Sequence, residues 1–252
     1  MPSLELYLQT LIQVVQRAME EEPNHKILVF FPATKLVSFF SDVFEKVLNI
    51  PVIQLHSKRS QSSRMRNSSK FRTSKKAVMF TSDVSARGVD YPDVTHVIQI
   101  GAPENVEQYI HRLGRTARAG KKGRGTIVLL PFEAPFVKPL TDRGVTFDKK
   151  LSEQVESPST ANQEAQGQVL ERVGSDQLLK ESAQGAYRTF LGYYFEQRGR
   201  WRIGKISELA DFAQAFSTVC GLKEIPELSK KVATKLRLTG IPGIRISSEI
   251  VD

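Results

Sequence analysis

The sequence predicts an α/β fold, in which a parallel sheet carries helices on both faces and is followed by a small all-helical extension. Short runs of branched and aromatic residues, typical of strands buried on both faces, alternate with segments of helical apolar spacing in the first 130 residues. From residue 175 onward only the helical spacing continues. Strand-like runs that alternate with helices indicate a parallel sheet, and the change of pattern indicates the extension.

The individual elements follow from the spacing of apolar residues. Apolar positions three or four apart over residues 4–18 predict an amphipathic helix, and residues 26–31 predict the first buried strand. The further strands are expected at residues 52–55, 77–81, 94–100 and 125–130. The helices between them are expected at residues 35–48, 59–72 and 104–112.

A change in composition divides the chain. We expect an α/β unit over residues 1–150, a linker or mobile loop over 151–174 and a helical extension over 175–252. The start of the linker is rich in Ser, Gln, Glu, Thr and Pro and has few large apolar residues. Breaks within the extension are expected at Gly192, Gly199, Gly221 and Pro226.

Composition excludes several classes of protein. With 40% hydrophobic and 25% charged residues, the chain has ordinary globular composition. It has no apolar run near the ~20 residues that cross a bilayer, so we expect no membrane partner. The single cysteine, Cys220, excludes an intrachain disulfide and is most simply a buried small hydrophobe. His25, His56 and His96 have no metal-like spacing, and we expect no metal site in the chain.

Positive charge is concentrated in the first unit. Residues 1–150 contain 23 Lys and Arg against 14 Asp and Glu, whereas residues 151–252 contain 13 of each. A net charge of +9 that lies wholly in one unit indicates a polyanionic partner for that unit.

Two polar segments are candidates for chemistry. The first, residues 81–90, follows a strand, where open parallel sheets place their ligands; a solvated turn is the alternative. The second, residues 109–120, holds His111, Arg112, Arg115 and Arg118 within eight residues. Guanidinium groups three residues apart suit phosphate oxygens, whereas a basic helix end that complements the helix dipole explains only one arginine.

In order, spacing and content, these segments resemble the C-terminal RecA-like domain of DEAD-box RNA helicases. The resemblance covers about residues 25–135 and rests on residues 28–31, 55–64, 81–90 and 111–118. Residues 187–194 and 221–238 are similar to the helical extension of the subgroup that includes fungal mitochondrial RNA-chaperone helicases. The resemblance implies a RecA-like fold, and the subgroup implies a mitochondrial location. The single cysteine independently suits a reducing, intracellular compartment.

The resemblance also implies roles toward a nucleotide. Arg115 and Arg118 would be arginine fingers that stabilise the charge developing on the γ-phosphate of ATP. Asp90 would accept a hydrogen bond from the ribose. His111 and Arg112 would organise the contact with the other RecA-like domain.

The chain lacks the parts that hold the triphosphate. It contains no Gly-x-x-x-x-Gly-Lys-Ser/Thr segment and no Asp-Glu-Ala-Asp run to hold magnesium. We therefore expect ATP and Mg²⁺ to bind only together with an N-terminal RecA-like domain of the same protein. Alone, the chain is expected to hydrolyse no ATP.

An acid-free basic run indicates contact with RNA phosphates. Residues 58–76 contain eight Lys and Arg and no Asp or Glu, and their only aromatic residue, Phe71, is a core candidate. We therefore expect contacts with the RNA backbone, indifferent to sequence, with shape and 2′-hydroxyl groups distinguishing A-form RNA from DNA. A solvated basic helix is the alternative. The expected RNA-binding residues are Lys35, Lys58, Gln61, Arg64, Thr81 and Arg87. Thr81 and Arg87 are expected chiefly because of the resemblance.

Three functions remain open at this point. The chain is interpreted as the RNA-binding half of an ATP-dependent RNA helicase or RNA chaperone, expected to be monomeric. A standalone ATP-independent RNA-binding module and a DNA-translocating helicase are the alternatives. In the extension, Trp201 among three arginines either contacts RNA or, as we favour, seals a helix junction.

Overall fold

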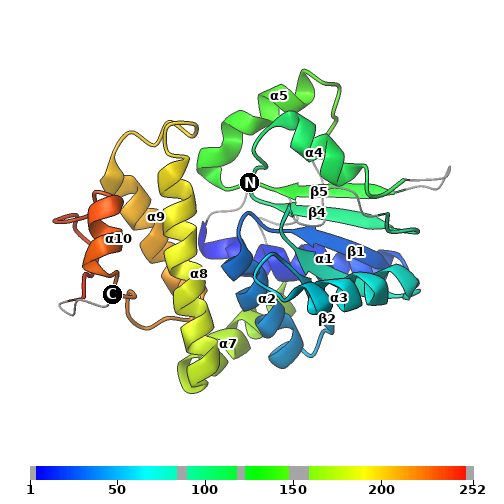
Figure 1. Ribbon diagram of the computed structural model, residues 1–252, viewed down its shortest axis with the longest axis horizontal. Helices are drawn as coiled ribbons and strands as arrows, with labels where there is room; N and C mark the ends of the chain where they lie inside the picture. The colour runs from blue at the N-terminus through cyan, green and yellow to red at the C-terminus, as the bar shows by residue number, and fades with distance from the viewer. Residues whose placement is uncertain (1–3, 84–89, 118–122, 148–158, 248–252) are drawn as a thin grey trace.

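A five-stranded parallel sheet forms the centre of the protein (Figure 1). The structure, a computed structural model, describes residues 4–83, 90–117, 123–147 and 159–247. The strands lie in the order β2-β3-β1-β4-β5. Their bounds are β1 (Lys26–Phe30), β2 (Val52–Leu55), β3 (Ala77–Thr81), β4 (His96–Ile100) and β5 (Arg124–Val128). All five strands lie within two residues of the predicted positions, so the predicted α/β fold is confirmed.

Helices connect the strands and continue beyond them. In the sheet unit they are η1 (Leu4–Leu6), α1 (Tyr7–Glu21), α2 (Thr34–Lys46), α3 (Gln61–Thr73), α4 (Val106–Leu113), η3 (Pro131–Phe136) and α5 (Val137–Thr141). In the extension they are α7 (Thr160–Ser175), α8 (Gln177–Glu196), α9 (Ile206–Val219) and α10 (Lys230–Lys235). No described helix is long and apolar enough to cross a membrane.

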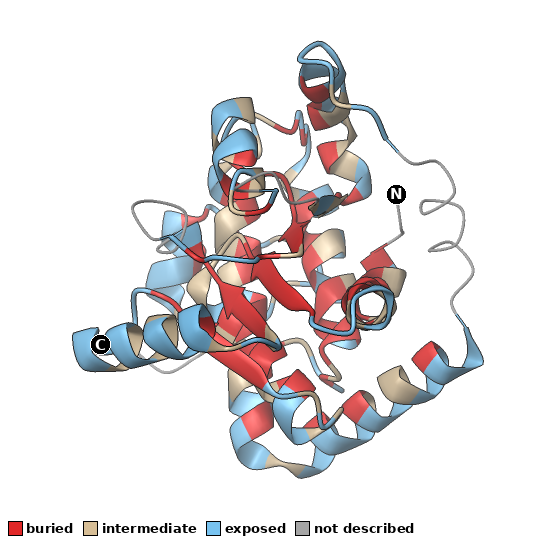
Figure 2. Cartoon of the chain, turned by 90° about the vertical axis from the view of Figure 1, so that its right-hand side faces the viewer, coloured by how far each residue is buried: buried red, intermediate tan, exposed pale blue. Residues whose placement is uncertain are grey.

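Strands β1 to β4 are buried on both faces, as their mostly apolar sequences predict, whereas the edge strand β5 is partly exposed (Figure 2). Alternate residues of β1 enter two different clusters. Leu28 and Phe30 pack in the cluster that includes Phe71 of α3, whereas Ile27 and Val29 pack in the cluster formed with α1 and α2. Phe71 is completely buried, which confirms its predicted place in the core.

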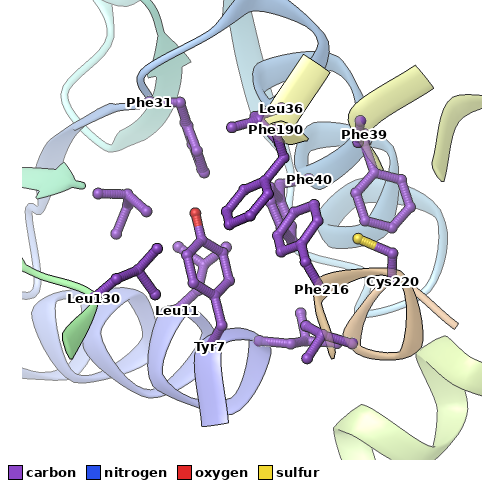
Figure 3. Close-up of a cluster of buried hydrophobic side chains, with 14 of the residues drawn as sticks. Tyr7, Leu11, Phe31, Leu36, Phe39, Phe40, Leu130, Phe190, Phe216 and Cys220 are labelled. Carbon is purple, nitrogen blue, oxygen red and sulfur yellow. The ribbon is translucent and has the colours of Figure 1, made fainter. Parts of the chain in front are cut away.

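The extension shares one hydrophobic core with the sheet unit. Helix α8 packs on α2, α7 packs on α1, and α9 packs on η1. Figure 3 shows where they meet: the ring of Phe190 stacks on that of Phe216 with centroids 4.0 Å apart, and Tyr7 meets Phe216 edge-on at 5.5 Å. Because this cluster is continuous, removal of the extension would expose part of the core of the sheet unit.

Two expectations for the C-terminal part are wrong. Residues 160–174, expected in a linker, belong to α7, which buries Val169 and Val173 against its neighbours after the N-cap Ser159. Two buried valines one turn apart are enough to hold this helix against its neighbours, because its other side can remain exposed to water. Gly192 does not interrupt the helix, because α8 continues through it. The free energy gained by burying residues on either side of Gly192 exceeds the ~1 kcal/mol by which a glycine destabilises a helix.

Two expectations for single residues are confirmed. Trp201 is buried at a turn after α8, where the guanidinium of Arg200 lies 4.0 Å from its ring centroid. Cys220 is completely buried at the end of α9, and burial raises the pKa of its thiol well above the ordinary value.

Candidate functional site

The parallel strands bring several predicted residues to one edge of the sheet. Lys35 lies in the first turn of α2, just after β1, and Lys58 lies in the loop after β2; both are exposed. Since β1, β2 and β3 are parallel neighbours, the segments that follow them meet at the carboxyl edge of the sheet. The structure therefore brings Lys35 and Lys58 to a common edge.

A buried histidine reports how closely this positive charge is gathered. His56 follows β2 and is almost fully buried, with its Nε2 atom 3.2 Å from the Ser38 hydroxyl oxygen. Burial lowers the pKa of His56, and the nearby charges of Arg59, Lys35 and Lys58 lower it further. His56 therefore lies near three cationic groups, which make the surface around it positive.

Helix α3 continues this surface from its first turn. Its N-cap, Ser60, accepts a hydrogen bond from the amide N–H of Ser63 and so fixes where the helix begins. Gln61 is exposed and accepts a hydrogen bond from the guanidinium of the half-buried Arg64. We define the basic face as Lys35, Lys58, Arg59, Gln61 and Arg64.

Thr81 does not contribute its side chain to this face. It is completely buried at the end of β3, and its hydroxyl donates to the carbonyl oxygen of Leu55 at 2.7 Å. That bond ties the end of β3 to the end of β2, and the expected place of Thr81 along an RNA path stays a prediction. Arg87, expected beside it, lies outside the described residues.

The arginine-rich turn follows α4. The N-cap Asn105 begins this helix by accepting a hydrogen bond from the amide N–H of Gln108, and Gly114 caps its end. His111 is exposed on α4, as its predicted contact with another domain requires. Arg118 lies outside the described residues, so its direction relative to Arg115 is not given by the structure.

Arg112 lies inside the domain, so it would organise a contact with another domain only through the residues that it holds in place; that role stays a prediction. Its guanidinium is buried, lies 5.1 Å from the ring centroid of Phe30, and binds Asp83 through Nε at 2.9 Å and Nη2 at 2.6 Å. Arg112 projects from the side of α4 that covers the sheet, and the consecutive His111 projects away from it. The pair joins the two candidate polar segments to each other.

Arg115 lines a hollow at the opposite edge of the sheet. The hollow has a volume of about 470 Å³ and lies at the amino ends of β1 and β4. Arg115 is half-buried there, and its Nε donates to the carbonyl oxygen of His111 at 3.3 Å. Asp90 is exposed nearby, and its carbonyl oxygen accepts a hydrogen bond from Nε of Arg72, which lines the same hollow.

Sequence reasoning missed several residues that hold these segments. Arg72 is one such residue: in the sequence it is only one charge of the basic run, and nothing there pairs it with Asp90. The sequence offered one signal for the partner of Arg112, since Asp83 lies in the polar loop after β3. Among the described residues, no three His, Cys, Asp or Glu side chains gather to hold a metal ion.

Comparison with known proteins shows where such an arrangement occurs. Residues 7–120 match the helicase conserved C-terminal domain. DEAD-box ATP-dependent RNA helicase 26 of Oryza sativa subsp. japonica is 37% identical over 96% of this chain and 43% of its own length. DEAD-box ATP-dependent RNA helicase 31 of Arabidopsis thaliana is 37% identical over 96% of this chain and 32% of its own length. The chain thus spans less than half the length of these curated relatives.

A solved structure shares the whole fold, extension included. The structure described as Mss116p DEAD-box helicase domain 2 bound to an RNA duplex covers 100% of this chain and 98% of its own, with a TM-score of 0.76 at 23% identity. Its likeness extends the agreement from the sheet unit to the helices that follow it. Because fold, ordered polar segments and relatives all agree, the chain belongs to the DEAD-box helicases and is their C-terminal RecA-like domain.

Proposed function

We propose that this chain is the RNA-gripping half of an ATP-dependent RNA helicase. The basic face binds the sugar–phosphate backbone, and Arg115 and Arg118 complete the site for ATP held mainly by an N-terminal RecA-like domain of the same protein. The observation that supports this most directly is that Lys35 and Lys58 are both exposed at the carboxyl edge of the sheet, just after β1 and β2 end.

The basic face favours contact with backbone rather than with bases. Lysine and arginine neutralise phosphates without reading sequence, and the face has no exposed aromatic side chain among its described residues on which a base would stack. The relative with the same fold is described as bound to an RNA duplex, which supports RNA as the polyanion. A-form geometry and 2′-hydroxyl groups supply the preference over DNA.

The arginine-rich turn acts on the phosphates. When charge develops on the transferred phosphoryl group, guanidinium groups already in place stabilise it, and one such finger contributes a factor of about 10³ to 10⁵ in rate. Mg²⁺ and the triphosphate are bound by the N-terminal domain, since this sequence lacks a Gly-x-x-x-x-Gly-Lys-Ser/Thr cradle. The relatives named as ATP-dependent RNA helicases support this division of the site between two domains.

Reconstitution tests the nucleotide part of the proposal. ATP hydrolysis is measured for this chain alone, for the N-terminal RecA-like domain of the same protein alone, and for the two joined, each with and without an RNA duplex. We expect RNA-stimulated hydrolysis only in the joined protein, reduced by about 10³-fold or more in Arg115→Ala or Arg118→Ala. Arg172→Ala, an exposed arginine of α7, is the matched control and keeps the activity. Hydrolysis by this chain alone, or equal activity in Arg115→Ala, contradicts the proposal.

RNA binding is tested by its dependence on salt. The affinity for a labelled RNA duplex is measured by fluorescence anisotropy between roughly 50 and 200 mM salt. Over this range the release of counterions appears as a slope of log K against log salt. Lys58→Gln is expected to weaken binding and to reduce the slope of log K against log salt by about 0.9, whereas Lys138→Gln, an exposed lysine of α5, leaves the slope unchanged. Equal affinity for matched RNA and DNA duplexes contradicts RNA as the partner. RNA binding that the N-terminal domain and ATP never alter indicates an ATP-independent module instead.

A further inference from the structure

A helix of the basic face also holds the aspartate expected at the ribose. Arg72 lies in the last turn of α3, and its Nε donates to the backbone carbonyl oxygen of Asp90 at 3.1 Å. Two further contacts from α3 fix the next residue: the ring of Phe71 meets that of Tyr91 edge-on at 5.1 Å, and the hydroxyl oxygens of Ser68 and Tyr91 lie 3.0 Å apart. The backbone at residues 90–91 is therefore placed by α3.

Arg72 is itself held by a buried lysine. Lys26 begins β1 and is only 2% exposed, and its ammonium group donates to the carbonyl oxygen of Arg72 at 2.8 Å. Burial lowers the pKa of Lys26, whereas the nearby carboxylate of Asp93 raises it. A buried ammonium group is costly unless it is bound, so this lysine fixes the end of α3 to the sheet.

The same arginine lines the hollow that receives Arg115. Arg72, Lys26 and Arg115 form its cationic side together with Lys75, and Asp93 and Glu22 are its acidic residues. Arg72 thus stands between the backbone of Asp90 and the hollow that Arg115 also lines. Arg72 belongs neither to the arginine-rich turn nor to the basic face as defined above, so neither of them explains an arginine at position 72.

We propose that Arg72 is a positioning residue for Asp90, and that it sets the preference of the enzyme for the ribose of ATP. The inference rests on the proposed function, because Asp90 acts on ribose only if the chain completes a nucleotide site. Arg72 acts through the backbone of Asp90: when its guanidinium is removed, the backbone at residue 90 loses this hydrogen bond, and the carboxylate that it carries is directed less well at the ribose hydroxyl groups. A contact made equally in the ground state and the transition state changes KM for ATP rather than kcat.

The test compares ATP with 2′,3′-dideoxy-ATP in the joined two-domain protein. A hydrogen bond to a charged group is worth about a tenfold or greater preference for the nucleotide with hydroxyl groups, measured as the ratio of kcat/KM values. We expect Asp90→Ala and Arg72→Gln each to bring that ratio toward one through KM for ATP, and the double variant to lower it no further, because both changes act on one contact. Arg115→Ala lowers kcat for both nucleotides and keeps the ratio. Arg17→Gln removes an arginine from a surface ion pair of α1 and is the matched control.

A second measurement on this chain alone separates the two proposals. Hydrogen exchange of the backbone amides in residues 90–95 is expected to become faster in Arg72→Gln, and to a smaller extent in Lys26→Met. The thermal midpoint of unfolding is expected to fall less in these variants than in a variant of the hydrophobic core. Absence of hydrolysis by the joined wild-type protein refutes the proposed function, and exchange then decides the position of Arg72. Unchanged exchange at residues 90–95, or a ribose preference that Arg72→Gln retains while Asp90→Ala loses it, overturns the inference.

Discussion

Arg112 binds Asp83 with two donors on one oxygen: Nε lies 2.9 Å and Nη2 lies 2.6 Å from Oδ1. The two ends of this pair differ in their access to water, since the arginine side chain is 3% exposed and the aspartate side chain 47%. The pair therefore joins the loop after β3 to α4 through an ion pair in which the arginine is buried and the aspartate is exposed to solvent.

This difference predicts unequal costs for the two single substitutions. Asp83→Ala leaves a buried guanidinium whose side-chain hydrogen bonding among the described residues is reduced to the Gln99 side chain, 3.5 Å away, and is expected to cost about 2 kcal/mol or more. Arg112→Met leaves an aspartate that water solvates, so it is expected to cost less. The double variant Asp83→Ala/Arg112→Met should be more stable than Asp83→Ala alone. Urea denaturation followed by the fluorescence of Trp201, the sole tryptophan, measures all four free energies. An Arg112→Met variant that is the least stable of the set contradicts this account.

A buried carboxylate joins the extension to the sheet unit. Glu133 is completely buried and accepts three hydrogen bonds of 2.9 Å, from the amide N–H groups of Ala102 and Leu130 and from the hydroxyl of Tyr194. Burial raises the pKa of Glu133, although the three donors oppose that rise. Because Tyr194 belongs to α8 and Ala102 follows β4, one side chain connects both parts of the protein.

Tyr194→Phe is therefore expected to destabilise the fold by about 1 to 2 kcal/mol, through loss of one donor to a buried acceptor. Glu133→Gln is expected to cost more, about 2 to 3 kcal/mol, because an amide N–H₂ group replaces an acceptor where donors converge. Tyr193→Phe removes the hydroxyl of the adjacent, half-buried tyrosine and is the control. Urea denaturation compares the three variants, and a Tyr194→Phe variant no less stable than Tyr193→Phe would show that the bond to Glu133 contributes nothing.

The sequence predicts those parts of this protein in which neighbouring residues share one environment. Runs made up mostly of apolar residues reveal β1 and β4, because a strand buried on both faces needs apolar side chains on both of them. A sequence pattern does not predict features that depend on the direction or the partner of a single side chain. Nothing in the order His111-Arg112 tells which residue faces the sheet, since that depends on the direction from which α4 approaches it. The bond of Arg72 to Asp90 spans 18 residues and that of Glu133 to Tyr194 spans 61, and both are set by tertiary packing.

Gly185 gives room to a lysine of the basic face. It lies within α8, and a Cβ atom there would stand 3.6 Å from Cδ and 3.9 Å from Nζ of Lys35. These are ordinary contact distances, so Gly185→Ala is expected to stabilise the protein by up to about 1 kcal/mol through helix propensity, with RNA affinity unchanged.

Gly185→Glu places a carboxylate beside Lys35 and is expected to weaken RNA binding and to lower the salt slope by about 0.9, as loss of one phosphate contact does. Gly192→Glu makes the same change of charge about 10 Å further along α8, where no atom lies within 4 Å of the added Cβ, and is the control. Anisotropy titrations of an RNA duplex measure the slopes. Equal slopes for the two glutamate variants would remove Lys35 from the RNA-binding surface.

His96 makes the stability of the fold depend on pH. It lies in β4 with Nε2 2.8 Å from the hydroxyl oxygen of Thr126. Its pKa is lowered to about 4, chiefly by burial; the carboxylate of Glu21 opposes this change, and Arg124 and Arg17 add to it. Above the unfolded pKa of about 6.5 the histidine is neutral in both states, and its environment costs nothing. As the pH falls from there toward 4, the unfolded chain takes up the proton first, so the free energy of unfolding decreases.

The expected loss at pH 4.5 is about 2 to 3 kcal/mol, from a shift of this size in a nearly buried group. Because carboxylates also titrate in this range, the measured quantity is the difference between wild type and His96→Gln in urea denaturation at pH 7.5 and 4.5. That difference should move in favour of the variant at the lower pH. Thr126→Val keeps the histidine and its burial, the larger cause of the lowered pKa, so it should retain the wild-type dependence. Parallel pH profiles for wild type and His96→Gln would mean that His96 takes up its proton equally easily in both states.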